Sequence, residues 1–438
     1  MNDDPMAQIE SAPMHLRQVA IVFLCIALNS LDGLDALAIS YASPGIAAEW
    51  GISKSALGVV LSMELFGMAA GSIFIGNIAD RIGRRPVIIG CLTVMVVGML
   101  GATAASGVLS LSVARLVTGL GIGGMLSSTS ALVAEYASAK RRSLCAALNI
   151  TGYSVGAVAG GAVASSLLAA GHDWRSVFIV GGLATGVALP FAIWLLPESI
   201  AFLLAARPKM ALERINHALR AIAKHPIMGL PQRAARFERS SFTALFTDGR
   251  AVTTCLLTTA YFAQIIPYYF ILKWSPKIIV DLGFPTAQAV RVLAFANLGG
   301  LSGAALVGFV AQAWRPRVLV ICATLCGFVT LAMFAAGRHE IFEIGVLLSV
   351  ATFFVNAGVV GMYPILVQAF PTTLRATGTG FVIGLGRGGS ALSPILVGAL
   401  LARGCGVVAV TLVTGSGCLI AATALLLMPL ARRDRVGP

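Results

Sequence analysis

Two carboxylates in the first long apolar segment are the residues of this sequence best placed to do chemistry. Asp32 and Asp35 are three positions apart, so a helix presents both side chains on one face. Ionisable groups inside a membrane-spanning helix are costly to bury and usually belong to a functional site. Because two neighbouring carboxylates repel each other when both are charged, one of them is a candidate to bind and release a proton. A permanent ion pair with a cation of the helix packing is the alternative.

Four further charged residues, away from the segment ends or of special interest by position, are Glu64, Arg115, Lys273 and Arg387. At a rise of about 1.5 Å per residue, Arg115 reaches nearly the depth of Asp32, so we expect these two to pair. Glu64 is a second candidate for a proton path. Arg387 lies near the middle of its segment, where its planar guanidinium could bind a substrate carboxylate or form an internal ion pair. Lys273 comes late in its segment, and we expect it to reach water at the outer surface.

The sequence offers few other groups for chemistry. All five histidines lie at the ends of apolar segments or between them. The eight cysteines lie almost entirely within apolar segments, without the pattern of a zinc site or a disulfide framework. We therefore expect no metal and no cofactor. Because there is also no Ser/His/Asp grouping and no phosphate-binding loop, we do not expect an enzyme.

The elements that must position these residues are membrane-spanning helices. Of the 438 residues, 58% are hydrophobic and 11% are charged, whereas a soluble protein has roughly 45–50% and 25%. Apolar stretches long enough to cross a bilayer predict twelve spans, near 17–41, 53–78, 86–105, 109–135, 142–170, 176–196, 251–280, 287–312, 316–336, 341–368, 374–402 and 405–430. Lipid is therefore the main partner of the surface. The formal charge of +13 forms no basic face, so we expect no nucleic acid.

The basic residues between the spans indicate the orientation of the chain. If the N-terminus is cytoplasmic, about 22 Lys and Arg lie on the inner side and 6 on the outer side. This asymmetry is the positive-inside pattern of multi-span proteins. We predict a multi-pass protein of the plasma membrane, the inner membrane of a bacterium, with both termini in the cytoplasm.

One long polar stretch divides the chain into two halves. We predict a six-helix bundle over 1–196, a cytoplasmic linker over 197–250 and a second six-helix bundle over 251–438. Within the linker, 205–224 has apolar residues at helical spacing and basic residues on the other side, which predicts an amphipathic helix.

The two halves contain related segments. The residues from Glu135 to Arg142 and those from Gln368 to Arg375 follow equivalent spans, and glycines follow each segment. We expect Glu135, Arg142 and Arg375 to act in gating. Two parallel repeats imply a pseudo-twofold axis along the membrane normal and a cavity at the repeat interface.

A second candidate gate is the loop after the second span. Gly76 would let two helices approach closely, Asp80 could pair with a cation or a helix N-terminus, and Gly83 would permit a tight turn. The loop reads Gly76-Asn-Ile-Ala-Asp80-Arg81-Ile-Gly83-Arg84-Arg85-Pro86.

The ordered combination of residues in this loop resembles the signature loop of the major facilitator superfamily. The resemblance covers essentially the whole chain, including Arg115-xxx-Gly119-xxx-Gly123 and Pro197-Glu198-Ser199. A narrower set of motifs is similar to the aromatic acid:proton symporters, namely Asp32-Gly-Leu-Asp35, Trp274-Ser-Pro276 and Gly386-Arg387-Gly-Gly389.

This resemblance implies an all-α membrane protein with two six-helix pseudo-symmetric bundles. It implies proton-coupled import of an aromatic carboxylate, such as a benzoate or hydroxybenzoate, by alternating access. The partners would be protons and a small organic anion, and we expect the protein to act as a monomer. Import of a sugar or another organic solute stays open, and so does efflux of a small metabolite by proton antiport. The role of Lys273 and the identity of the substrate are not determined by the sequence.

Overall fold

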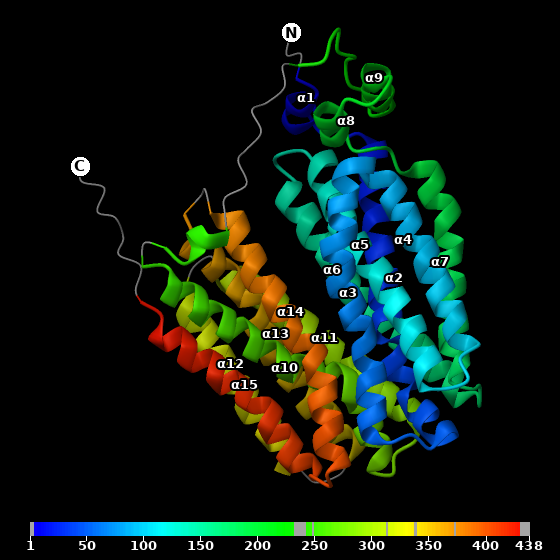
Figure 1. Ribbon diagram of the computed structural model, residues 1–438, viewed down its shortest axis with the longest axis vertical. Helices are drawn as coiled ribbons and strands as arrows, with labels where there is room; N and C mark the ends of the chain where they lie inside the picture. Colours follow the sequence, from blue (N-terminus) through cyan, green and yellow to red (C-terminus); the bar gives the residue numbers. More distant parts are fainter. Residues whose placement is uncertain are drawn as a thin grey trace. The chain divides into compact units, whose positions relative to one another are not determined.

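The computed structural model describes residues 4–231, 242–247, 249–311, 314–336, 340–371 and 374–429, and its regular elements there are all helices (Figure 1). Twelve of these helices are long and apolar enough to cross a membrane, which confirms the predicted number of spans. The described residues form two compact units, one from residues within 1–52 and 63–236 and the other from residues within 53–62 and 237–438. The helix that follows residue 53 therefore contributes to both units.

The first unit contains most of the N-terminal half. Its helices are α1 (Pro5–Ser11), α2 (Leu16–Trp50), most of α3 (Lys54–Ile82), α4 (Arg84–Thr103), α5 (Val108–Tyr136), α6 (Arg142–Ala169), α7 (Arg175–Leu195), α8 (Ile200–Ala206) and α9 (Ala211–Ala221). The short helices α1, α8 and α9 gather at one end of this unit (Figure 1).

The second unit contains the helices that follow the linker. They are the short 3-10 helix η1 (Phe242–Leu245), α10 (Ala251–Asp281), α11 (Thr286–Val310), α12 (Pro316–Ala336), α13 (Ile341–Ala369), α14 (Arg375–Ala402) and α15 (Val407–Leu427).

The first span is longer than the sequence predicted. Helix α2 runs for 35 residues to Trp50, although the apolar stretch was expected to end near residue 41. Pro44 does not end the helix, and Gly51 ends it with a left-handed φ of 56° that glycine adopts without steric cost. Hydropathy locates the bilayer-crossing part of a helix, but it does not report where the backbone stops being helical.

The amphipathic helix of the linker is shorter than the predicted range 205–224. Helix α8 ends before Pro208, and both Arg207 and Met210 have positive φ, so the chain turns before α9 begins. Helix α9 buries Ile215 and Leu219 on one face. The predicted linker residues 232–241 and 248 lie outside the described residues.

Candidate functional site

A buried ion pair joins two helices of the first unit. A terminal nitrogen of Arg115 lies 2.8 Å from Oε2 of Glu64, and both side chains are fully buried. The same nitrogen, Nη2, donates a hydrogen bond of 2.8 Å to the backbone carbonyl of Asp35, while Nη1 donates to Sδ of Met99 at 3.0 Å. The guanidinium also lies over the ring of Phe178, 5.4 Å from its centroid. The predicted partner of Arg115 was the carboxylate of Asp32, whereas the structure pairs it with Glu64.

Glycines explain why Glu64 and Arg115 meet. A Cβ added to Gly119 of α5 would overlap the backbone carbonyl of Glu64, and one added to Gly67 of α3 would overlap the carbonyl of Leu116. The backbones of α3 and α5 are therefore in direct contact, as small residues allow in membrane helices. Gly119 follows Arg115 by one turn. The contact at Gly119 therefore sets the helix register in which the side chains of Glu64 and Arg115 face each other.

Asp32 and Asp35 are both completely buried in the first unit. Thr185 of α7 donates a hydrogen bond of 3.2 Å to Oδ2 of Asp35. Neither carboxylate oxygen of Asp32 has a hydrogen-bond partner among the described residues, and neither does Oδ1 of Asp35. A charged carboxylate without partners is very costly in an apolar interior.

The position of these carboxylates follows from the packing of α2 on α6. A Cβ at Gly33 would overlap the carbonyl of Tyr153, and one at Gly156 would overlap Ser30. Tyr41 of α2 donates a hydrogen bond of 2.6 Å to the backbone carbonyl of Ala157 of α6. With this side of α2 held against α6, Asp35 reaches α5 and α7, inside the bundle of the first unit.

The loop between α3 and α4 is held by Glu198, which follows α7. Oε1 of Glu198 accepts hydrogen bonds from the backbone N–H groups of Arg84, at 2.7 Å, and Arg85, at 3.3 Å. These N–H groups begin α4, where a helix end attracts negative charge. Gly83 precedes them with a φ of 105°, as expected for its turn role. Asp80 pairs with Arg84 at 2.8 Å.

Two other residues of this predicted gate contribute differently. Arg81, in the last turn of α3, is exposed. Gly76 was expected to allow close helix approach, but a Cβ there would meet only Oγ of Ser127 at 3.6 Å, an ordinary contact. The close approach occurs earlier in α3 instead, at Gly67 and Gly71.

The remaining gating candidates lie at the starts and ends of helices. Oε2 of Glu135 accepts a hydrogen bond of 2.6 Å from Ser199, next to Glu198. Arg142 pairs with Glu10 of α1 at 2.7 Å, a contact that the sequence analysis missed. Arg375, in the second unit, begins α14 and is exposed.

In the second unit, the predicted anion ligand Arg387 lies where α14 packs on α10. A Cβ at Gly386 would overlap the ring of Tyr261, and one at Gly389 would overlap the carbonyl of Phe262. The hydroxyl groups of Tyr261 and Tyr363 lie 3.5 Å apart. Arg387 itself is half-buried. An arginine and an aromatic pair thus occur on adjoining helices of one unit.

Lys273 is buried, in contrast to the prediction that it reaches water. Its exposed fraction is 1%, and its neighbour Trp274 donates a hydrogen bond of 3.2 Å to the carbonyl of Pro394. Helix α10 continues to Asp281, so Lys273 lies two turns before its end. The predicted span, 251–280, is nearly the same as this helix, so the burial comes from the packing around Lys273 and not from the length of the helix.

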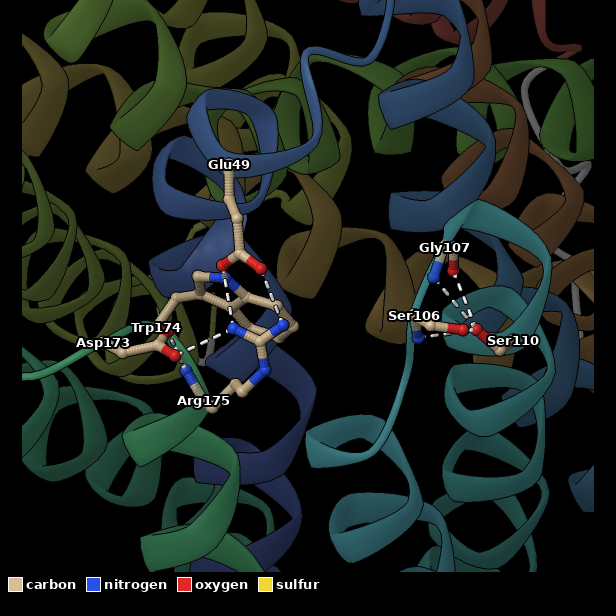
Figure 2. Close-up of polar contacts among 7 residues, drawn as sticks. All are labelled: Glu49, Ser106, Gly107, Ser110, Asp173, Trp174 and Arg175. Atoms are coloured by element: carbon tan, nitrogen blue, oxygen red, sulfur yellow. Dashed lines mark hydrogen bonds and ion pairs between the residues drawn. The ribbon is translucent and has the colours of Figure 1, made fainter.

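A polar cluster that the sequence analysis missed joins the end of α2 to the start of α7 in the first unit (Figure 2). Arg175 binds both carboxylate oxygens of Glu49 at 2.7 and 2.8 Å and lies over the ring of Trp174, 4.3 Å from its centroid. Asp173 also accepts a hydrogen bond from Arg175 at 2.8 Å.

Near the start of α5, Oγ of Ser110 accepts hydrogen bonds from the backbone N–H groups of residues 106 and 107 (Figure 2). Such caps need only local polar residues, which carry no distinctive motif.

The family described as the Major Facilitator Superfamily matches residues 22–317 of this chain. The chain therefore belongs to the major facilitator superfamily, and it is a multi-pass membrane transporter, not an enzyme. The fold agrees with this assignment. The crystal structure of a D-xylose-proton symporter has a TM-score of 0.72 at 17% identity and covers 94% of this chain and 97% of that one. An inward open structure of the xylose transporter XylE from E. coli has a TM-score of 0.74 at 16% identity, covering 95% and 98%.

Relatives by sequence are named as transporters of aromatic acids. The chain is 31% identical to the 4-hydroxybenzoate transporter PcaK of Pseudomonas putida, over 89% of this chain and 87% of the relative. It is 30% identical to a gallate transporter of Pseudomonas putida, over 95% and 93%. It is 29% identical to the 3-(3-hydroxy-phenyl)propionate transporter of Escherichia coli K12, over 96% of both. These matches confirm the predicted resemblance to aromatic acid transporters of the superfamily.

Proposed function

We propose that the protein imports an aromatic carboxylate together with protons by alternating access. It would act as a monomer in the plasma membrane of a bacterium, with both termini in the cytoplasm. The relatives named above support an aromatic acid as the substrate, because each is similar to this chain over about nine tenths of its length. The positive-inside charge pattern supports the orientation.

The observation that carries the proton coupling is the environment of Asp32. This carboxylate is fully buried, and its two oxygens have no hydrogen-bond partner among the described residues. Arg115 does not supply a counter-charge to it, because the arginine is paired with Glu64 and hydrogen-bonded to the backbone of Asp35. Asp32 is thus suited to carry a proton, which makes it neutral while it stays buried.

The Glu64–Arg115 pair has a different role in this proposal. The guanidinium of Arg115 balances the charge of the Glu64 carboxylate, so we assign this pair to the packing of α3 on α5 and not to proton transfer. Asp35, on the same helix as Asp32, contacts Arg115 directly. Its backbone carbonyl accepts a hydrogen bond from Arg115, and its carboxylate accepts one from Thr185. A change in the protonation of Asp32 would therefore be transmitted through α2 to Arg115.

Arg387 is the proposed ligand for the substrate carboxylate in the second unit. Its guanidinium can donate two parallel hydrogen bonds to a carboxylate. The adjoining rings of Tyr261 and Tyr363, with centroids 6.3 Å apart, are suited to pack against an aromatic substrate. Proton site and anion site would then belong to different units.

Purified protein in liposomes tests this proposal directly. An imposed pH gradient, with the outside acidic, should drive accumulation of labelled 4-hydroxybenzoate or gallate inside the liposomes. A protonophore should abolish that accumulation. Protein-free liposomes are essential, because the neutral form of an aromatic acid crosses lipid unaided. D-xylose should not accumulate.

The Asp32→Asn variant should insert and bind substrate but fail to accumulate it, because asparagine keeps the shape and cannot titrate. Accumulation by this variant at the level of the native protein would remove Asp32 from the coupling. Transport of D-xylose but of no aromatic acid would overturn the substrate class.

A further inference from the structure

The first unit contains a cavity of about 810 Å³ beneath the amphipathic helix α9. It is lined by residues of α9, of the starts of α2 and α4, and of the end of α7. Figure 1 shows α8 and α9 at this end of the unit, which the charge pattern predicts to be cytoplasmic. The cavity is separate from the buried Asp32 and Arg115, which do not line it.

The charged groups of this cavity are mainly positive. Its lining includes four arginines and two glutamates, namely Arg17, Arg85, Arg214, Arg220, Glu198 and Glu213. The charge of Glu198 is already compensated, because its Oε1 accepts three backbone N–H groups, two of them at the start of α4. In addition, Nε of Arg85 is buried and has no hydrogen-bond partner among the described residues. The cavity therefore presents an excess of donors and positive charge.

An apolar surface adjoins these arginines. Ile82, Trp194 and Leu195 also line the cavity, and their exposed fractions are 53%, 78% and 42%. They lie at the ends of the spans α3 and α7, where tryptophan typically marks the boundary between lipid and water. A soluble anion would use only the arginines, whereas a lipid would use both surfaces.

We propose that this cavity binds the headgroup of an anionic phospholipid. The phosphodiester would lie among Arg85, Arg214 and Arg220, and the acyl chains would run along Ile82 and Trp194. Basic pockets on the cytoplasmic side of membrane helices are suited to such headgroups, because that leaflet is rich in anionic lipid. Bound lipid would also attach α9 to the start of α4 and the end of α7.

Quenching of tryptophan fluorescence by brominated lipids tests the proposal, because Trp194 lies beside the site. The full-length protein is reconstituted in phosphatidylcholine with increasing amounts of brominated phosphatidylglycerol. The reference samples contain the same lipids, with the phosphatidylcholine brominated and the phosphatidylglycerol not. The Trp194 signal is the difference between the native protein and Trp194→Phe. We expect phosphatidylglycerol to be preferred by at least tenfold.

The variant Arg214→Gln/Arg220→Gln should lose most of this preference, because it removes two of the three guanidinium groups that would donate to the phosphodiester. The matched control is Lys140→Gln/Lys209→Gln, which removes the same charge from two exposed residues of the first unit that do not line the cavity. Size-exclusion profiles and melting temperatures verify that both variants fold.

Two results would overturn the proposal. If the lysine control loses as much preference as the arginine variant, the attraction is a diffuse surface effect and the cavity is not a binding site. If glycerol 3-phosphate in solution displaces the brominated lipid with similar affinity, the ligand is a soluble phosphate. Melting temperatures that rise with phosphatidylglycerol for the native protein and the lysine control, but not for the arginine variant, would support it independently.

Discussion

Removing the charge of Glu64 should destabilise the first unit more than any exposed ion pair could. At 2.8 Å and an effective dielectric constant of about 20, the attraction between Glu64 and Arg115 is about 6 kcal/mol. Most of this offsets the desolvation of two buried charges, but a single removal leaves the other charge buried and uncompensated. The expected loss of unfolding free energy for Glu64→Gln is therefore about 3–5 kcal/mol.

The single variant Arg115→Gln should also be strongly destabilised, because it leaves the carboxylate of Glu64 buried without the charge of its arginine partner.

Equilibrium unfolding in mixed detergent micelles, followed by circular dichroism, measures these losses. The double variant Glu64→Gln/Arg115→Gln should be more stable than the sum of the single losses predicts, because neither charge is left alone. Glu340→Gln, which removes an exposed acid, is the control. Additive losses, or a loss below about 1 kcal/mol for Glu64→Gln, would refute the buried pair.

Three further outcomes are expected. Asp80→Ala should slow uptake and leave equilibrium binding of substrate unchanged, with a stability loss below about 1 kcal/mol because the Asp80 side chain is 52% exposed; a large loss of binding would contradict its gating role. Arg387→Lys should weaken binding of an aromatic acid roughly tenfold and reduce the protein's preference for the acid over the matched amide, because a single ammonium group replaces a planar guanidinium with two parallel donors. An unchanged preference for the acid would exclude Arg387 as the ligand. Arg175→Gln should lower the unfolding free energy by about 1–2 kcal/mol through Glu49 and the ring of Trp174, and a loss equal to that of exposed Arg403→Gln would show that the cluster is not stabilising.

The number of spans could be predicted because hydropathy is a local property. Each bilayer-crossing helix needs a stretch of about 20 mostly apolar residues, and the sequence shows such a stretch for each of the twelve spans. The family could also be recognised, because the loop after the second span has an unusual order of residues. In contrast, α2 continues to Trp50, beyond its apolar stretch, and Lys273 is buried although its span was predicted almost correctly. Hydropathy reports neither where a helical backbone ends nor which side of a helix its neighbours cover.

The partner of Arg115 shows why the site itself was harder to predict. The helical rise gives the depth of a residue along its span, and by depth alone Asp32 was a reasonable partner. A pair also requires both side chains to point toward each other around their helix axes, and depth carries no such information.

Glycines carry the missing information about direction. Gly119 lies one turn after Arg115 and contacts the backbone of Glu64, so the α3–α5 interface and the ion pair share one register. Gly33, between the two aspartates, contacts the backbone of α6 and so turns that face of α2 away from the charged cluster. The glycine of the Asp-Gly-Leu-Asp motif is therefore a packing residue that aims two carboxylates. A larger residue at position 33 should disturb the site without touching either acid, because it would separate α2 from α6 and rotate both carboxylates out of place.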